Sequence, residues 1–244
     1  MPILPALDSD GALFFDFDGT LVDLAPRPEA VCVSATLAAD LQALQRRCGG
    51  ALAIISGRPV DQIDGQLAPV RLPVAGVHGS ERRDAAGRWH RAPLPSLEAA
   101  RAALEAFCAA RPALRLELKP GALALHYRGA DALADACSAA MQQALGSTQG
   151  MVLLHGKKVI ELKAAAVDKG RAVAAFMAEP PFVGRRPWCF GDDVTDEAAF
   201  AAVLARGGVA VKVGDGDSIA PWRLSAPAAL REWVHHRARA GTPA

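Results

Sequence analysis

The stretch from Leu13 to Asp23, LFFDFDGTLVD, decides the fold class of this chain. Its first residues are apolar and predict a buried β-strand, but two aspartates, Asp16 and Asp18, lie at the end of that strand. Two carboxylates this close repel each other, and burying either one costs free energy unless a positive charge compensates. The pair therefore indicates a polar site at the carboxyl end of a core strand.

Apolar runs alternate with helical patterns on both sides of the chain's middle. Further strands are predicted within residues 51–59, 70–83, 187–193 and 207–217, and helices within residues 34–48, from residue 60, and within 168–179, 195–205 and 226–240. Apolar strands that alternate with helices predict a parallel sheet covered on both faces. The expected fold class is α/β, with a Rossmann-like doubly wound core.

Residues 96–165 have a different pattern and predict an inserted α+β domain. A helix leads into two strands joined by a Pro120–Gly121 turn, and a second helix leads into a hairpin expected about His155–Gly156. Alternating polar residues in these strands favour an open-faced antiparallel sheet with helices on its other side. The predicted domains are a core of residues 1–95 and 166–244 and an insert of residues 96–165.

The composition excludes several classes of protein. The 244 residues include 27 Lys and Arg against 26 Asp and Glu, and this near balance does not support a nucleic-acid or membrane-surface protein. No segment reaches the apolar length that spans a bilayer, and the first ten residues lack the regions of a signal peptide. The five cysteines show no CxxC spacing and are predicted to be buried free thiols, which favours the cytoplasm.

The polar residues that end the core strands are predicted to meet at one edge of the sheet, because ligands of open parallel sheets bind beyond the carboxyl ends of the strands. These residues are Asp16, Asp18, Ser56, Asp192 and Asp193, with Lys169 at the start of a helix. Hard carboxylate ligands with retained waters suit Mg²⁺. A lysine, hydroxyl groups and a helix start beside a metal form a phosphate site.

This set of side chains predicts phosphoryl transfer. Asp16 can attack phosphorus and form an aspartyl-phosphate, and Asp18 can protonate the leaving oxygen and then activate water. Gly19 allows the sharp turn after the strand, and the Thr20 hydroxyl can donate to the phosphate.

Four segments together resemble the haloacid dehalogenase (HAD) superfamily of phosphohydrolases. They are DFDGTL, IISGR, the lysine of DKG, and GDDVTDE, and they occur in the order typical of that superfamily. Within it, AGVHGSE, ELKPGALALHYR and GKKVIEL resemble the trehalose-6-phosphate phosphatase family, which carries a C2-type cap domain. The resemblance covers nearly the whole chain from about Leu13.

The resemblance implies roles for individual residues. Asp16 and Asp192 would bind Mg²⁺ through their side chains and Asp18 through its backbone carbonyl, with Asp193 and Asp196 around the metal. Ser56 and Lys169 would hold the phosphate. The sugar pocket would be lined by residues of the insert, which acts as a cap: Glu117, Lys119, Arg128, Lys157 and Glu161. The implied activity is hydrolysis of trehalose 6-phosphate, with a functional link to a trehalose-phosphate synthase.

Strand alternation in the insert supports a polar ligand independently. One face of the predicted strands is apolar, and the other carries charged side chains that can bind sugar hydroxyls. The spacing alone does not identify the sugar. Phosphatases for other sugar phosphates, such as sucrose phosphate or a glycosyl phosphoglycerate, and a non-catalytic sugar-phosphate sensor remain open.

Several of these residues also have simpler interpretations. Ser56 could cap an ordinary helix. Arg58 and His78 are expected to bind substrate, but Arg58 could instead pair with an acid, and His78 could be structural in a tight turn. Asp196 and Glu197 could be charges that favour a helix N-terminus. The charged face of the insert could be no more than a solvated sheet.

Overall fold

The computed structural model describes residues 4–8, 10–25, 31–93 and 95–240, and these form two compact units. Residues 91–167 make up one unit, and the described residues before 91 and after 167 make up the other. The chain therefore leaves the first unit once and returns to it once. Each unit has its own sheet and its own hydrophobic core.

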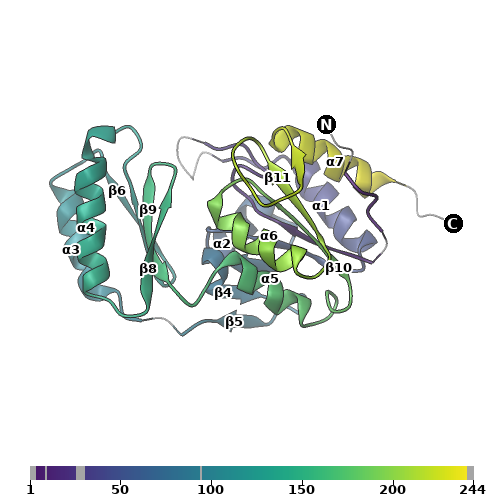
Figure 1. The fold of residues 1–244 in the computed structure, drawn as a ribbon, viewed down its shortest axis with the longest axis horizontal. Coiled ribbons are helices and arrows are strands. Elements are labelled where there is room, and N and C mark those ends of the chain that lie inside the picture. The colour runs from purple at the N-terminus through teal and green to yellow at the C-terminus, as the bar shows by residue number, and fades with distance from the viewer. Residues whose placement is uncertain (1–3, 9, 26–30, 94, 241–244) are drawn as a thin grey trace. The chain divides into compact units, whose positions relative to one another are not determined.

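The first unit is built on an eight-stranded sheet (Figure 1). Its strands, in spatial order, are β12 (Trp222–Leu224), β11 (Val209–Val213), β10 (Arg186–Gly191), β1 (Gly11–Phe15), β2 (Leu52–Ile55), β3 (Val74–Gly76), β4 (Glu81–Arg83) and β5 (Trp89–Arg91). The strands from β12 to β3 are parallel, and β4 runs antiparallel to β3. The parallel core is as predicted, whereas β12, β4 and β5 were not expected as separate strands.

Helices cover both faces of this sheet because the strands are apolar on both sides. Leu13 and Phe15 of β1 face one cluster with α1 (Ala35–Arg47), α2 (Val60–Leu67) and α7 (Pro227–Arg239). Phe14 faces the opposite cluster with α5 (Lys169–Met177) and α6 (Glu197–Leu204), where it stacks on Phe182 at 5.4 Å between ring centroids. This confirms the doubly wound α/β class.

The second unit is a four-stranded antiparallel sheet in the order β6 (Arg115–Lys119), β7 (Ala122–His126), β9 (Val159–Ala164) and β8 (Met151–Gly156). Two helices, α3 (Glu98–Ala109) and α4 (Ala134–Gly146), pack on one face of it (Figure 1). The core of this unit contains Leu123, Leu125, Ile160 and Leu162 from the sheet. The alternation in the sequence therefore assigned the apolar face of β7 and β9 correctly, whereas Leu118 of β6, expected on the same face, is exposed.

The second hairpin of this unit turns two residues later than predicted. Gly156 pairs with Val159, so the turn is formed by Lys157 and Lys158, and His155 lies within β8. A turn at His155–Gly156 would place Leu153 opposite Lys158. The observed register places Leu153 opposite Leu162, which is fully buried, and hydrophobic pairing therefore determines the register.

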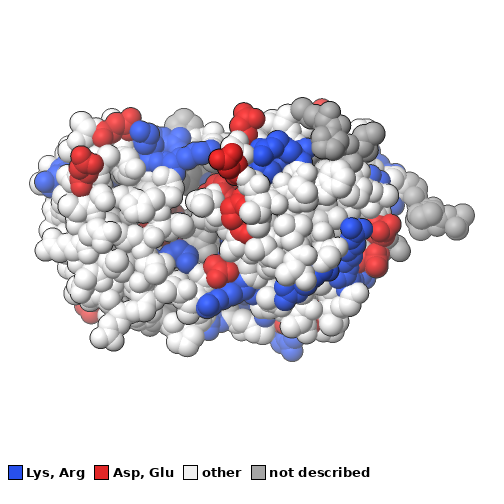
Figure 2. Space-filling view, viewed as in Figure 1, with Lys and Arg blue, Asp and Glu red and all other residues white. Residues whose placement is uncertain are grey.

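The five cysteines are free, as expected, but not all of them are buried. Cys48, Cys137 and Cys189 are buried, Cys108 is partly buried and Cys32 is exposed, so the prediction of burial was wrong for Cys32. No helix in the described parts of the chain is long and apolar enough to cross a membrane. Figure 2 shows Lys and Arg interspersed with Asp and Glu on one face, which fits the near balance of charge.

Candidate active site

The polar residues predicted to end the core strands do so in the structure. Asp16 follows β1, Ser56 follows β2 and Asp192 follows β10, and Lys169 is the first residue of α5. The three strands are neighbours or next neighbours in the parallel sheet, so their carboxyl ends open onto the same edge. Asp16, Ser56 and Lys169 are each at most 5% exposed.

The ammonium group of Lys169 holds the centre of the site together. Its Nζ donates to Asp16 Oδ1 and to Asp196 Oδ1, both at 2.7 Å. Burial lowers the affinity of Lys169 for its proton, but Asp16 and Asp196 outweigh this effect and raise its pKa well above the usual value. Lys169 is therefore charged, and it compensates two carboxylates that are themselves buried.

Asp196 lies at a helix start, as predicted, and it is buried there and binds the loop after β10. It is 1% exposed, and its Oδ2 accepts the backbone N–H groups of Asp192 and Asp193 at 3.0 and 3.1 Å. With Oδ1 bound to Lys169, both oxygens of Asp196 are used. Asp196 does lie in the first turn of the short helix Val194–Asp196, as the simple interpretation held, but its bond to Lys169 makes it more than a helix-terminal charge.

Asp193 has a different role from its neighbours. Its carboxylate accepts from the backbone N–H and the hydroxyl of Thr195 at 2.8 and 2.6 Å and caps the short helix Val194–Asp196. Burial would raise the pKa of Asp193, but Lys169 and the bonds from Thr195 outweigh it and lower that pKa.

Asp16, Asp192 and Asp196 form a group that fits a metal ion. Carboxylate oxygens of all three lie within 4.8 Å of one another. Burial and mutual repulsion raise the pKa of Asp16 well above its usual value and that of Asp192 to about 6. A divalent cation would relieve this repulsion, and carboxylate oxygens are the ligand type that such cations prefer. Asp16 and Asp192 are the better ligands of the three, because both oxygens of Asp196 are already bonded.

Gly19 and Thr20 shape the loop that faces Asp192. Gly19 has a φ of +83°, and a Cβ on it would lie 2.3 Å from Asp192 Oδ2, so only glycine fits there. Thr20 is fully buried, and its hydroxyl donates to Asp192 Oδ1 at 3.1 Å. In the structure this hydroxyl orients a carboxylate, and its predicted contact with phosphate stays a prediction.

Arg58 makes a two-pronged ion pair with Asp18. Its Nε lies 2.6 Å from Asp18 Oδ2 and its Nη2 lies 2.7 Å from Asp18 Oδ1. Pairing with an acid was one of the two alternatives that the sequence left open for Arg58. Ser56, in the same loop, accepts from the backbone N–H of Arg58 at 3.1 Å and does not cap α2, which begins after Pro59 without a side-chain cap.

His78 lies beside this loop in an unusual backbone conformation. Val77 and His78 have φ values of 47° and 56°, and the His78 N–H donates to the Ser56 carbonyl at 2.9 Å. A Cβ on Gly57 would lie 2.9 Å from the His78 ring, so the ring packs against the loop that carries Ser56. His78 is 6% exposed, and its location is compatible with a structural role.

The sugar-binding residues predicted in the second unit form two groups. On the polar face of the sheet, Lys119 Nζ pairs with Glu161 Oε2 at 2.9 Å, and Glu117 Oε2 is bonded to the His126 ring at 2.8 Å. Burial would raise the pKa of Glu117, but the bond to His126 and the charge of Lys119 lower it. Arg128 and Lys157 are exposed at the end of the sheet, where Arg128 Nη2 donates to the Lys157 carbonyl at 3.4 Å.

The structure adds Lys212 to the residues around the site. Lys212 is the fourth of the five residues of β11, is 4% exposed and donates to the backbone carbonyl of Asp192. A lysine inside an apolar strand of a parallel sheet is unusual, because both faces of that strand are covered. The lysine in the apolar stretch VAVKV therefore indicated a buried charge with a specific partner. That partner, the Asp192 carbonyl, could not be identified without the fold.

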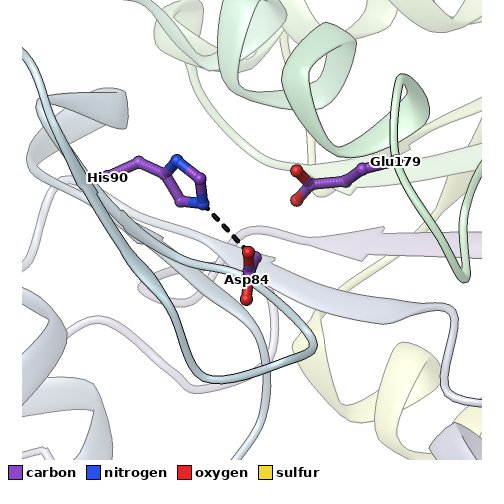
Figure 3. A group of neighbouring side chains, drawn as sticks. All are labelled: Asp84, His90 and Glu179. Carbon is purple, nitrogen blue, oxygen red and sulfur yellow. Dashed lines mark hydrogen bonds and ion pairs between the residues drawn. The ribbon is translucent and has the colours of Figure 1, made fainter.

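A second group of potential metal ligands lies at the other end of α5, where Asp84, His90 and Glu179 face one another (Figure 3). Their carboxylates are already paired, that of Asp84 with Arg88 at 2.9 Å and that of Glu179 with Arg82. Asp84 Oδ2 also bonds to His90 Nε2 at 2.9 Å. We interpret this group as an anchor for β5, the strand that leads out of the first unit.

Four hydrogen bonds converge on Asp84, so its replacement is expected to destabilise the protein. Burial would raise the pKa of Asp84, but the bonds from His90 and Arg88 outweigh it and lower that pKa well below its usual range. Asp84→Asn should reduce the free energy of unfolding at pH 7 by about 2 kcal/mol in urea titrations. A carboxylate with a lowered pKa stabilises the fold fully above its unfolded pKa and loses this effect as the pH falls toward its folded pKa. The difference should therefore shrink progressively as the pH falls below about 4.

The exposed Asp217, in the loop between β11 and β12, provides a control for this measurement. Asp217→Asn should leave the free energy of unfolding unchanged within about 0.5 kcal/mol. A difference between wild type and Asp84→Asn that stays constant from pH 7 to pH 3 would contradict the explanation from charge.

Comparison with known proteins gives consistent matches. The family described as trehalose-phosphatase matches residues 14–232. The trehalose-6-phosphate phosphatase of Escherichia coli (strain K12) is 43% identical over 232 residues, which cover 94% of this chain and 87% of that protein. A probable trehalose-phosphate phosphatase of Sinorhizobium fredii is 44% identical over 216 residues, covering 86% of this chain and 82% of that protein.

The fold has a counterpart among solved structures. A trehalose-6-phosphate phosphatase related protein superposes with a TM-score of 0.77 at 25% identity, covering 93% of this chain and 96% of that one.

Proposed function

This chain belongs to the trehalose-phosphatase family of the HAD superfamily, and we propose that it hydrolyses trehalose 6-phosphate to trehalose and phosphate. The observation that carries the proposal is the buried group of Asp16, Asp196 and Lys169 beside Asp192, at the carboxyl ends of β1 and β10. This group combines a carboxylate nucleophile, a phosphate-binding cation and oxygen ligands for a metal.

The divalent metal that the family implies would be Mg²⁺, held by the carboxylates of Asp16 and Asp192 and by the backbone carbonyl of Asp18. The donor set fits, since all its atoms are hard oxygens and its carboxylates need a compensating charge. When bound, the metal would neutralise charge on the attacking carboxylate and on the phosphoryl group. Asp196 would not bind the metal directly, because both of its oxygens are already bonded. It would hold Lys169 and the loop that carries Asp192 in position.

The reaction would proceed in two steps on Asp16. In the first, an Asp16 oxygen attacks phosphorus, the bond from phosphorus to the sugar oxygen breaks, and Asp18 gives a proton to that oxygen. In the second, Asp18 takes a proton from water, the water oxygen attacks phosphorus, and the Asp16–phosphorus bond breaks to release phosphate. Lys169 and Ser56 would hold the phosphoryl oxygens during both steps. The Thr20 hydroxyl would join them by turning its one O–H from Asp192 Oδ1 to the phosphate.

The insert of residues 96–165 would act as the cap that recognises the sugar. On its polar face, small residues of the central strand β7 separate charged side chains: Ala124 lies between Glu117 and Glu161, and Ala122 lies between Lys119 and Lys163. Lys119 and Glu161, on the strands either side of β7, pair across it, and both alanines are fully buried. Carboxylates and ammonium groups held this way on one face of a sheet can bind sugar hydroxyls.

Arg128 and Lys157, the other two predicted sugar-binding residues of the insert, would contact the sugar from the end of its sheet. Cytoplasmic location and a functional link with a trehalose-phosphate synthase stay predictions.

The proposed activity is tested by phosphate release from a panel of sugar phosphates. With Mg²⁺ present, kcat/KM for trehalose 6-phosphate should exceed that for glucose 6-phosphate and sucrose 6-phosphate at least about tenfold. Chelation of the metal should abolish release, and added Mg²⁺ should restore it. Faster turnover of another sugar phosphate would change the substrate assignment, and binding without turnover would favour a sensor.

Replacing the proposed nucleophile should abolish turnover without unfolding the protein. Asp16→Asn removes the attacking charge and should reduce phosphate release at least about 1,000-fold. Circular dichroism and thermal unfolding check the fold, and Asp135→Asn, on the exposed side of α4, is the control that should keep full activity. Substantial turnover by Asp16→Asn would exclude this residue as the nucleophile.

The proposed sugar contacts should matter only for sugar substrates. Glu161→Gln should lower kcat/KM for trehalose 6-phosphate about 10- to 100-fold but change that for p-nitrophenyl phosphate less than about threefold, because the aryl group has no hydroxyls to bind. Glu105→Gln, in an exposed i,i+4 pair with Arg101 on α3, is the matched control. Equal losses on both substrates would contradict a sugar-binding role for Glu161.

A further inference from the structure

We propose that Arg58 is a positioning residue, which holds the Asp18 carboxylate in the orientation that proton transfer requires. The inference rests on the proposed function, because Arg58 acts through the residue assigned there as acid and base. It replaces the sequence-based expectation that Arg58 binds substrate.

The geometry of the ion pair is suited to orientation. Two nitrogens of the guanidinium group, Nε and Nη2, bind the two different oxygens of Asp18 at 2.6 and 2.7 Å. Such a fork aligns the planes of both groups, which a single point charge cannot do. The Asp18 side chain is 31% exposed whereas that of Arg58 is 9% exposed, so the carboxylate is held from the buried side and remains open to solvent.

Arg58 is itself held in place by its surroundings. Its guanidinium carbon lies 5.6 Å from the centroid of the Phe17 ring, and its backbone carbonyl accepts from Val77 N–H at 3.0 Å. Its backbone N–H donates to Ser56 Oγ at 3.1 Å. Arg58 thus links the proposed phosphate-binding hydroxyl of Ser56 to the carboxylate of Asp18.

This link has a specific chemical consequence. Asp18 without Arg58 can rotate about its side-chain bonds, so it would be misplaced both for donating a proton to the sugar oxygen and for taking one from water. The nitrophenolate leaving group needs no proton in the first step. Loss of Arg58 should therefore spare the formation of the aspartyl-phosphate from p-nitrophenyl phosphate and slow only its hydrolysis.

The test is a stopped-flow measurement with Mg²⁺ on Arg58→Lys, which keeps the charge but loses the fork, and on Arg58→Ala. Turnover of trehalose 6-phosphate should fall about 10- to 100-fold. The first turnover of p-nitrophenyl phosphate should stay within about threefold of wild type and appear as a burst before a slow steady state. A parallel loss in the first turnover and in trehalose 6-phosphate turnover would overturn the proposal, since a general disturbance of the site predicts that result.

The chain offers a matched control for these variants. Arg83 is also buried and also binds both oxygens of one carboxylate, that of Asp64, at 2.5 and 2.7 Å. Arg83→Lys should leave both rates unchanged within about threefold and produce no burst beyond that of wild type. A burst in Arg83→Lys equal to that in Arg58→Lys would overturn the proposal.

A double-mutant cycle with Asp18→Asn tests whether Arg58 acts through Asp18. Arg58→Lys should cost less than about threefold in the Asp18→Asn background, because the group it positions is already disabled. If the fold-losses of the two single variants multiply in the double variant, the residues act independently, and the proposal is overturned. Full turnover of trehalose 6-phosphate by Asp18→Asn alone would remove the acid/base role of Asp18 from the proposed function, and the role of Arg58 with it.

Discussion

The buried ammonium group of Lys169 is the interaction on which the active site depends. It compensates Asp16 and Asp196, which together with Asp192 would otherwise place like charges in a buried site. Removing one partner of such a buried pair costs about 3–5 kcal/mol, because it leaves a charge uncompensated. Lys169 begins α5, directly after the chain returns from the insert, so this compensation requires both halves of the core to be in place.

From this centre, a continuous set of contacts extends to the loops at the sheet edge. Asp196 binds the backbone of the loop after β10, and that loop presents Asp192 to Thr20. Gly19 must lack a side chain, because Asp192 fills the space where a Cβ would lie. The glycine and threonine of DFDGT therefore have a physical explanation, because the carboxylate of Asp192 packs against Gly19 and accepts from the Thr20 hydroxyl.

In the insert, local sequence patterns predicted the two faces of the sheet but not its strand register. Alternation in the sequence predicted its apolar and polar faces, because that period follows from strand geometry alone. It did not locate the second turn, since the register is determined by pairing of Leu153 with Leu162 across two strands. Nor did it predict that Ala122 and Ala124 would lie between charged neighbours, which depends on β7 being central in the sheet.

The sequence by itself determined the doubly wound core and the residues that end its strands, because the carboxyl ends of parallel strands meet at one edge whatever the side chains are. Only the tertiary structure decided which of those residues contact one another. Arg58 binds Asp18 and the Thr20 hydroxyl binds Asp192, and each pair joins segments from different strands. Hydrogen bonds of this kind depend on strand order and register, and no local spacing encodes the partner of a side chain that lies across a sheet.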